Sequence, residues 1–427
     1  MNAGRSDCDV LVVGAGAAGL WAAARAAEGG ARVCLFEKTP RAGTKVLASG
    51  GTHCNLTTTL PPEDAARLFG SAGARFLRHA FRALPPAAVR EHFRTLGVET
   101  VEAPLDKVFP ASGRARDVRD ALRAWALRAG ARLRLDSAVV GIEAPDPGGP
   151  WGVRLASGER VLTRFLVLAV GGRSFARTGT SGDGYRWLRE LDLPIVEPVP
   201  ALVPLTSPAG WVHELSGISL QDVEVRLAEP GGKTIARRSR PIVFTHTGIS
   251  GPGAMDLSEH VARAGRPLEA RLDLLPAVER EEVRALLIRF GSVPGRPGIG
   301  RALAQSGHVF PRRLVAALAR QAGFERPPSC ADLARASRHR LVEALKGLAV
   351  PIDGTLGFDR AEVTAGGLAL GAVDPGTMQV RSRPGLFVCG ELLDLQGPIG
   401  GLNFQAAFAT AELVGRTLQR TVPGAVS

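Results

Sequence analysis

The sequence has little of what marks a membrane protein, a disulfide-rich protein or a zinc protein. Its five cysteines are odd in number and scattered, with no Cys-x-x-Cys pair, so we expect neither a metal site nor a dithiol redox motif. Unpaired thiols are typical of a reducing compartment. No stretch approaches the ~20 apolar residues that a membrane helix needs. We recognise no signal peptide, because the most apolar N-terminal run, Val10–Val13, is short and is followed at once by glycines. We therefore expect a cytoplasmic protein that does not bind membranes.

Aromatic residues are also scarce, whereas positive charge is in excess. Aromatics make up 5% of the chain, the net charge is +12 and the sequence pI is about 10.5. Arginine is concentrated in residues 65–134 and 301–346. Such windows can form a surface for RNA or another polyanion, or they can reflect the Ala, Gly, Pro and Arg bias of a GC-rich genome. We favour the second explanation, because pI is weak evidence for a particular partner, and few aromatics are available to stack on bases.

A chain of 427 residues is long enough for two or three structural units. Residues 9–13 and 32–37 read as buried strands on either side of a helix at 17–28, which is a βαβ unit. From Pro194 the pattern changes to short strands punctuated by proline, and residues 276–346 are mostly helical. Strand and helix patterns return at 386–389 and 403–418. The first unit is therefore predicted to combine both ends of the chain.

The βαβ unit carries a glycine motif for nucleotide binding. Gly14, Gly16 and Gly19 stand between the first strand and the helix. In a GxGxxG turn the first glycine permits the bend, the second lets a pyrophosphate approach, and the third lets helix and strand pack closely. The free N–H groups at the helix start, at Ala17 and Ala18, attract phosphate. Glu37 ends the second strand, where an acid usually binds the adenosine ribose.

The C-terminal segment favours FAD over NAD as the nucleotide. Residues 385–405 read as a strand, the acid Glu391, a Gly-Gly turn at Gly400 and Gly401, and a helix start. In flavoproteins of the glutathione-reductase type, such a strand brings its acid to the ribityl chain, and the helix directs its positive end at the flavin pyrimidine. A protein that binds only NAD needs no such segment.

A loop rich in small residues at 41–57 follows Glu37, and with other motifs it establishes a family resemblance. These motifs are Lys107-Val-Phe-Pro-Ala-Ser-Gly-Arg-Ala, Gly171-Gly-Arg-Ser, Gly179-Thr-Ser-Gly-Asp-Gly, Pro200-Ala-Leu-Val-Pro-Leu, Phe244-Thr-His-Thr-Gly-Ile-Ser-Gly-Pro and Thr364-Ala-Gly-Gly. In this order, along nearly the whole chain, they resemble the BaiN/YhiN-like (aminoacetone oxidase-like) family of FAD-dependent oxidoreductases. The chain departs from the family where Thr52 and His53 replace Gly-Arg before Cys54, and where Leu402 replaces an aromatic residue.

The resemblance implies an α/β fold. A discontinuous Rossmann-like FAD-binding domain of the glutathione-reductase type would hold an inserted β-barrel-like domain and a helical subdomain. We place the first part of the FAD domain at 1–193, the β-rich insertion at 194–275 and the helical subdomain at 276–346. Residues 347–427 would return to the β-rich part and then complete the FAD domain.

The resemblance also implies which residues line the flavin. The predicted FAD contacts, from motif and resemblance together, are Gly14, Gly16, Ala17, Ala18, Gly19, Glu37, Lys38, Gly43, Lys45, Ser49, Gly50, Gly51, Cys54, Asn55, Val139, Gly171, Gly172, Asp183, Gly184, Gly390, Glu391, Gly400, Gly401, Leu402 and Asn403.

Three residues are candidates for the chemistry itself. His246 lies in a polar loop that we expect to begin a helix, and a histidine titrates near neutral pH. Cys54 could exchange a proton with a substrate carbon, and Lys45 could place a positive charge near the flavin ring. A structural role is an alternative for each of them.

We expect an enzyme that transfers hydride between flavin N5 and a small organic substrate, either by C=C reduction or by amine or alcohol oxidation. No second GxGxxG exists for a nicotinamide domain, so NAD(P)H is expected at most as a transient donor. A flavoprotein that reduces a pyrimidine base in RNA is the alternative, and a flavin-binding regulator without turnover is a third possibility.

Overall fold

The computed structural model describes residues 6–305 and 307–422. The chain divides into two compact units, of which the first combines residues 1–199 with 362–427 and the second spans 200–361. The sequence pattern changes at Pro194, slightly before the boundary between the two units. The reason is that strand β10 (Ile195–Ala201) pairs with β20 (Val363–Leu368) of the first unit.

A seven-stranded sheet forms the centre of the first unit. Its order is β6-β2-β1-β9-β8-β7, and β21 pairs with β9. The strands are β1 (Cys8–Val13), β2 (Val33–Phe36), β6 (Arg132–Arg134), β7 (Val139–Glu143), β8 (Trp151–Leu155), β9 (Arg160–Leu168) and β21 (Leu386–Val388). Five of them run parallel, whereas β7 and β8 form an antiparallel hairpin on β9. This is the predicted α/β sheet, with its last parallel strand supplied by the C-terminal part of the chain.

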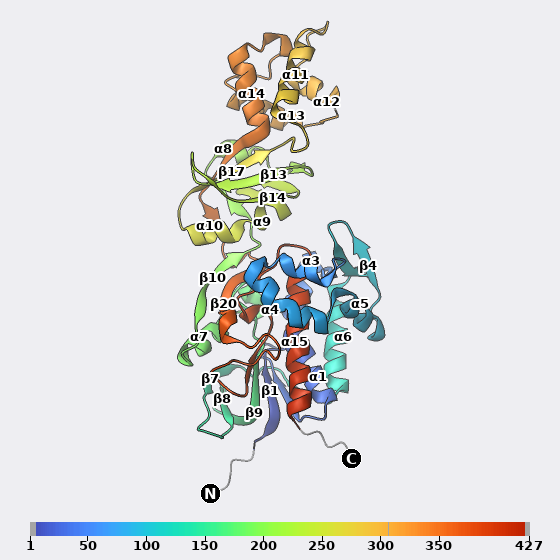
Figure 1. Ribbon diagram of the computed structural model, residues 1–427, viewed down its shortest axis with the longest axis vertical. Coiled ribbons are helices and arrows are strands. Elements are labelled where there is room, and N and C mark those ends of the chain that lie inside the picture. The colour runs from blue at the N-terminus through green and yellow to red at the C-terminus, as the bar shows by residue number, and fades with distance from the viewer. Residues whose placement is uncertain (1–5, 306, 423–427) are drawn as a thin grey trace. The chain divides into compact units, whose positions relative to one another are not determined.

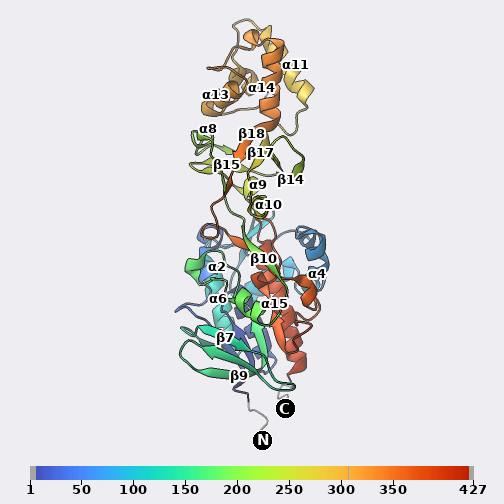
Figure 2. The same cartoon turned by 90° about the vertical axis from the view of Figure 1, so that its left-hand side faces the viewer.

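Two helices that are far apart in the sequence lie side by side against this sheet. Helices α1 (Ala17–Glu28) and α15 (Leu402–Thr421) pack along each other, as Figure 1 shows. Figure 2 shows α15 in the view turned by 90°. Most residues of α1 are alanine, and nine of its positions are buried. Small side chains allow α15 to come close, so the Ala-rich sequence determines this packing.

The remaining elements of the first unit surround this core. The helices are α2 (Thr44–Ala48), α3 (Pro62–Arg67), α4 (Gly70–Ala83), α5 (Pro86–Thr95), α6 (Ala115–Arg128) and α7 (Asp183–Glu190). A small sheet, in the order β3-β5-β4, consists of β3 (Thr57–Thr58), β4 (Thr100–Ala103) and β5 (Lys107–Pro110). A short 3₁₀ turn, η5 (Gly390–Leu392), follows β21.

Antiparallel strand pairs dominate the second unit. One sheet has the order β12-β15-β16-β11-β19 and the other the order β14-β13-β17-β18. The strands are β11 (Leu205–Thr206), β12 (Ser219–Leu220), β13 (Glu224–Ala228), β14 (Thr234–Ser239), β15 (Ile242–Thr245), β16 (Gly248–Ser250), β17 (Leu268–Asp273), β18 (Leu348–Ile352) and β19 (Gly354–Thr355). Their inward-facing residues, Val225, Leu227 and Leu272 among them, are fully buried. The unit thus has a core of its own.

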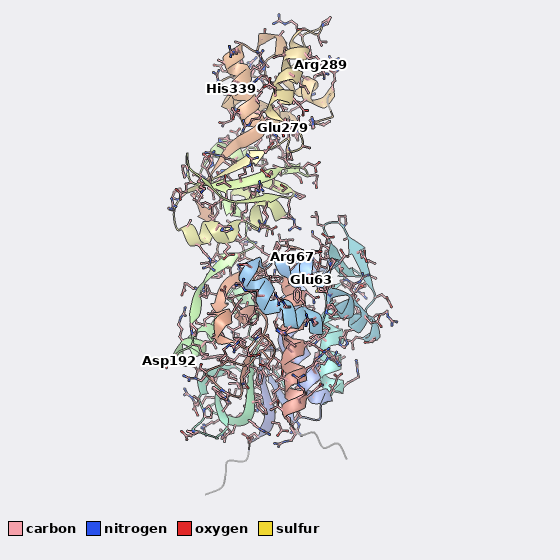
Figure 3. The ribbon with its side chains drawn as sticks, in the orientation of Figure 1. Glu63, Arg67, Asp192, Glu279, Arg289 and His339 are labelled. Atoms are coloured by element: carbon pink, nitrogen blue, oxygen red, sulfur yellow. The ribbon has the colours of Figure 1, made fainter. Side chains whose placement is uncertain are left out.

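The second unit also contains helices. Its short helices are α8 (Gly210–His213), α9 (Pro252–Met255) and α10 (Ser258–Ala264), and the helical part consists of α11 (Arg280–Gly291), α12 (Ile299–Gln305), α13 (Arg312–Gln321) and α14 (Arg335–Gly347). Glu279 and Glu282 form a capping box at the start of α11, which satisfies N–H groups that a helix start leaves unpaired. Figure 3 labels Glu279 at this helix start. Among the described residues, none of the helices combines the length and the apolar character that crossing a bilayer requires.

Candidate cofactor site

The glycine turn between β1 and α1 has the geometry of a phosphate cradle. Gly14 has φ +98°, and a Cβ there would lie 2.6 Å from the carbonyl oxygen of Ala169. A Cβ on Gly19 would lie 1.8 Å from the oxygen of Gly14. At Gly16, by contrast, a Cβ would meet nothing within 4 Å, and no side chain caps α1. The turn is therefore closed toward the protein and open where a pyrophosphate would approach the helix start.

Glu37 lies directly beside this turn. Its Oε2 accepts a hydrogen bond of 3.0 Å from the backbone N–H of Ala15, and its Oε1 accepts one of 2.9 Å from the N–H of Thr39. The Glu37 carbonyl accepts from the N–H of Ser137, which brings the start of β7 at Val139 close to it. The acid is almost completely buried and is held where an adenosine ribose would lie.

An ion pair between Lys38 and Asp183 lies beside Glu37. Nζ of Lys38 lies 2.7 Å from Oδ2 of Asp183 at the first turn of α7, and it also contacts Ser181. A Cβ on Gly179 would come within 3.9 Å of Oε1 of Glu37. The structure thus brings the predicted residues Lys38 and Asp183 together beside Glu37, although 145 positions separate them, whereas Gly184 packs close to Val170 and Leu392.

The loop after β2 adopts an unusual backbone. Gly43, which precedes α2, and then Gly50, Gly51, Thr52 and Cys54 all have positive φ. For Thr52 this conformation is a true outlier, because a β-branched side chain rarely tolerates it. Such strain is concentrated at functional sites, so the loop has the character expected of one that encloses a cofactor.

Cys54 is fully enclosed within that loop. Its side chain is buried, and burial raises the pKa of the thiol to about 12. The raised pKa makes this thiol even less ready to ionise than an ordinary cysteine. His53 beside it is exposed, and its Nδ1 lies 3.2 Å from the carbonyl oxygen of Gly50.

Lys45 and Glu391 form an ion pair across 346 positions of the chain. Nζ of Lys45 lies 2.6 Å from Oε2 of Glu391 and 2.7 Å from Oγ of Ser174. Glu391 also accepts from the N–H of Thr364 at 2.8 Å and from the Ser174 hydroxyl at 3.1 Å. A Cβ on Gly172 would lie 2.4 Å from Oγ1 of Thr364, so only glycine fits there.

Ser174 and Thr364 had no predicted role. Their motifs, Gly171-Gly-Arg-Ser and Thr364-Ala-Gly-Gly, contributed to the family resemblance. Oγ1 of Thr364 accepts from the backbone N–H groups of Arg173 and Ser174. Ser174 and Thr364 therefore hold Glu391 in place. The signal in the sequence was that each of these hydroxyl residues lies two positions from a pair of glycines.

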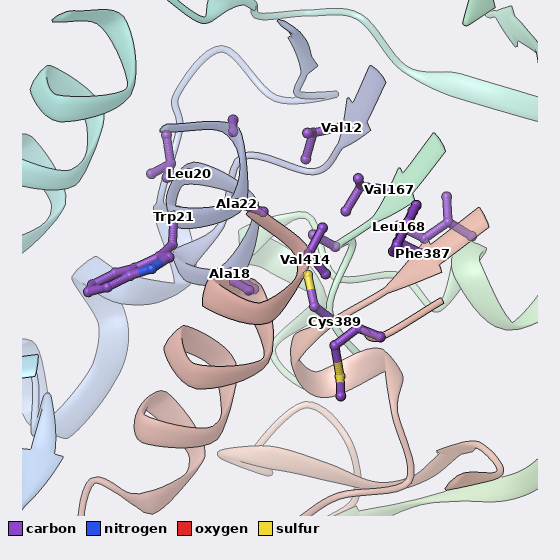
Figure 4. Packing of buried hydrophobic residues seen from close by; sticks show 14 of the residues in the cluster. Val12, Ala18, Leu20, Trp21, Ala22, Val167, Leu168, Phe387, Cys389 and Val414 are labelled. Atoms are coloured by element: carbon purple, nitrogen blue, oxygen red, sulfur yellow. The ribbon is translucent and has the colours of Figure 1, made fainter. Parts of the chain in front are cut away.

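The C-terminal strand brings η5 against α1. A Cβ on Gly390 would lie 2.9 Å from Cβ of Ala18, and the Gly390 N–H donates to Oγ1 of Thr410. Figure 4 shows Ala18 and Ala22 of α1 packed near Cys389 and Val414. This close packing places the glycine turn and Glu391 in one region.

Helix α15 begins beside the loop of Cys54. Gly401 precedes it with φ +81°, and a Cβ there would lie 2.1 Å from the carbonyl oxygen of Thr57. No side chain caps α15. The Asn403 amide is engaged locally, since it accepts from the N–H and donates to the oxygen of Gly397. Leu402 is buried. The open end of α15 is thus a backbone feature, and Asn403 shapes the loop before it.

His246 belongs to the second unit. The prediction that its loop begins a helix was wrong, because Thr245 ends β15 and Gly248 begins β16, so His246 lies in the turn of a β-hairpin. Its side chain is exposed. Apolar residues alternate along this segment, as is typical of paired strands. The next helix, α9, starts only at Pro252.

Comparison with known proteins identifies the family. The profile of the HI0933-like protein Rossmann domain matches residues 8–417. The chain belongs to this HI0933-like family. A 3-dehydro-bile acid delta(4,6)-reductase of Clostridium scindens is 30% identical over 95% of this chain and 97% of its own. A ribosomal RNA dihydrouridine synthase of Escherichia coli is 31% identical over 94% of this chain and 96% of its own.

Among solved structures, the fold matches a 3-ketosteroid delta1-dehydrogenase of Sterolibacterium denitrificans. The TM-score is 0.50 at 13% identity, covering 97% of this chain and 99% of that one. The HI0933-like protein is an FAD-dependent oxidoreductase with a Rossmann-type FAD-binding domain, which confirms the predicted family, fold class and cofactor.

The residues of the first unit fit FAD. The open glycine turn suits its pyrophosphate, Glu37 suits the adenosine ribose, and the uncapped start of α15 suits the electron-rich edge of the flavin. Among the residues that the structure describes, no group of three or more His, Cys, Asp and Glu side chains is placed to hold a metal ion.

Proposed function

We propose that this HI0933-like protein reduces a carbon–carbon double bond conjugated to a carbonyl group in a small organic substrate. The observation that carries this proposal is the similarity, over almost the full length of both chains, to a protein named as a delta(4,6)-reductase. The bound FAD would supply the hydride for this reduction at its N5 atom.

The chain's own residues would hold and polarise the cofactor. The N–H groups at the start of α1 would bind the pyrophosphate, and Glu37 would accept hydrogen bonds from the adenosine ribose. The uncapped start of α15 would stabilise negative charge on the pyrimidine edge. Lys45 and Glu391 would lie near the ribityl chain, with Lys45 adding a positive charge.

Conjugate reduction also needs a proton for the second carbon. The Cys54 thiol, in the strained loop predicted to enclose the flavin, is one proposed donor within the first unit. His246, exposed in the β15–β16 turn, is the other. Replacing each of the two residues with alanine shows which one donates the proton.

The electrons would come from transiently bound NADH or NADPH. A single GxGxxG motif is present, and FAD would occupy it. The five cysteines, all free thiols, favour a reducing compartment, so we propose that the protein acts in the cytoplasm.

RNA is the second candidate substrate, because a relative of equal similarity is named ribosomal RNA dihydrouridine synthase. The 5,6 double bond of uracil is also conjugated to a carbonyl, so the same chemistry would serve. The net charge of +12 would assist phosphate contacts.

An anaerobic titration tests the proposal. The purified yellow protein is mixed with NADH or NADPH, and bleaching of the flavin absorbance is followed. The reduced protein then receives either a cyclic enone or unmodified ribosomal RNA, and reoxidation is timed. Rapid reoxidation by the enone supports the proposal, whereas reoxidation by RNA alone, weakened steeply by salt, supports the second candidate. If neither substrate reoxidises the flavin, the result would favour a flavin-binding regulator without turnover.

A further inference from the structure

Tyr185 carries a buried hydroxyl group that makes no hydrogen bond. It is the single tyrosine of the chain and lies in the first turn of α7. The residue is only 3% exposed, yet no group of the described residues is a hydrogen-bond partner of its hydroxyl. Unsatisfied buried polar groups are rare in native proteins, because each one destabilises the folded chain. This hydroxyl therefore calls for an explanation.

Helix α7 places Tyr185 among residues predicted to hold FAD. The helix begins at Asp183, whose carboxylate forms the ion pair with Lys38. A Cβ on Gly184 would lie 2.8 Å from the side chain of Leu392, the last residue of η5. Helix α7 also packs on strand β20. Tyr185 thus lies in a helix that contacts both η5 and β20.

The Tyr185 hydroxyl lies near Glu391 of η5 and Thr364 of β20. Burial and then the charge of Glu391 raise the pKa of Tyr185, whereas the nearby Thr364 side chain lowers it. Oγ1 of Thr364 already accepts from the backbone N–H groups of Arg173 and Ser174. A hydroxyl oxygen has two lone pairs, so Thr364 has none left for the Tyr185 O–H.

The Glu391 carboxylate is also fully engaged. Its Oε1 accepts from Nζ of Lys45, from Oγ of Ser174 and from the N–H of Thr364, and its Oε2 accepts from Nζ of Lys45. A carboxylate offers about four acceptor sites, which these contacts occupy. The neighbouring side chains therefore leave no acceptor for the Tyr185 hydroxyl, and a bound ligand with free oxygen atoms would supply one.

We propose that Tyr185 is a further FAD-binding residue, whose hydroxyl donates a hydrogen bond to an oxygen atom of the cofactor beside Glu391. FAD offers the oxygen atoms of its ribityl hydroxyls and phosphates as acceptors. The inference concerns the cofactor alone, so it does not rest on the proposed function and holds whichever substrate is reduced.

The test compares Tyr185→Phe with the wild type, both prepared as full-length apoproteins. The FAD dissociation constant is measured by equilibrium dialysis and the thermal midpoint by calorimetry without FAD. We expect Tyr185→Phe to raise the dissociation constant about 10-fold, because one hydrogen bond to the cofactor is lost. The thermal midpoint of the apoprotein should stay equal or rise, because the variant lacks the unsatisfied hydroxyl.

Thr163→Val is the matched control, since it also removes a buried hydroxyl from the first unit. Oγ1 of Thr163 donates to the carbonyl oxygen of Phe165 at 2.9 Å. Thr163 pairs with Cys8 at the start of β1, whereas the glycine turn follows the end of that strand. This variant should show the reverse result, namely a lower thermal midpoint and an unchanged FAD dissociation constant.

A single tyrosine also allows a direct spectroscopic test. Labelling with [ζ-¹³C]tyrosine gives one NMR resonance, from the carbon that carries the Tyr185 hydroxyl, and FAD should shift it in the wild type. An unshifted resonance, or a Tyr185→Phe variant with wild-type affinity for FAD, would overturn the inference. A raised dissociation constant together with a lowered apoprotein midpoint would also overturn it, because the hydroxyl would then serve the fold. Each of these results would leave the proposed reduction of an enone untouched.

Discussion

The ion pair between Lys45 and Glu391 is the contact of the predicted flavin site whose strength follows most directly from the geometry. The two N···O distances are 2.6 and 2.9 Å, and the side chains keep 24% and 19% of their exposure. Partial burial reduces screening by water, so the pair should exceed the ~0–1 kcal/mol typical of surface pairs. We expect a coupling of about 2 kcal/mol, the range of hydrogen bonds between charged groups.

A double-mutant cycle measures this coupling. Lys45→Met, Glu391→Gln and the double variant are unfolded in urea as apoproteins, followed by tryptophan fluorescence. Four of the five tryptophans lie in the first unit, so the signal reports on that unit. The double variant should lose about 2 kcal/mol less than the sum of the single variants. A coupling below about 0.5 kcal/mol would refute the reasoning.

The same cycle tests whether the pair serves the cofactor. If Glu391 binds the ribityl hydroxyls, saturating FAD should weaken the measured coupling, because the carboxylate would then divide its hydrogen bonds. The exposed pair Arg67–Asp64 on α3 is the control, and its coupling should be close to zero with or without FAD. A coupling that FAD leaves unchanged would argue that the pair is purely structural.

The remaining predictions concern four residues. Glu37→Ala should raise the FAD dissociation constant at least 10-fold, because the ribose loses its acceptor, and equilibrium dialysis showing wild-type affinity would contradict this. Gly19→Ala should yield apoprotein with a lowered thermal midpoint, since its Cβ would lie 1.8 Å from the Gly14 oxygen; retained flavin would contradict the cradle. His246→Ala should lower kcat on the true substrate without loss of flavin, and unchanged kcat removes it from the chemistry. Burial alone would raise the pKa of Glu412, but hydrogen bonds and neighbouring arginine charge lower it. The ionised Glu412 carboxylate therefore stabilises the folded protein at neutral pH. Glu412→Gln should have a lower free energy of unfolding than the wild type at neutral pH, and this difference should shrink as pH falls through the lowered pKa, as urea unfolding across pH would show.

The sequence by itself determined the nucleotide-binding part of this protein. The motif from Gly14 to Gly19, the acid Glu37 and the strand–acid–Gly-Gly–helix segment after Gly385 each depend on local chemistry: positive φ, close backbone approach and a free helix start. Such requirements restrict the residue type at fixed spacings along the chain. These motifs can therefore be recognised in the sequence before the fold is known. The two chain ends could be joined into one FAD domain for the same reason.

Other features were decided by tertiary structure alone. The pairing of Lys45 with Glu391, and the support that Ser174 and Thr364 give it, joins residues hundreds of positions apart. No local pattern encodes such a contact, because it arises only when β21 and β9 pair and η5 reaches α2. The burial that raises the pKa of Cys54 likewise depends on what the folded chain packs around it. His246 was assigned to a helix start because polar loop residues are compatible with either element, and the strand pair of β15 and β16 decided the outcome.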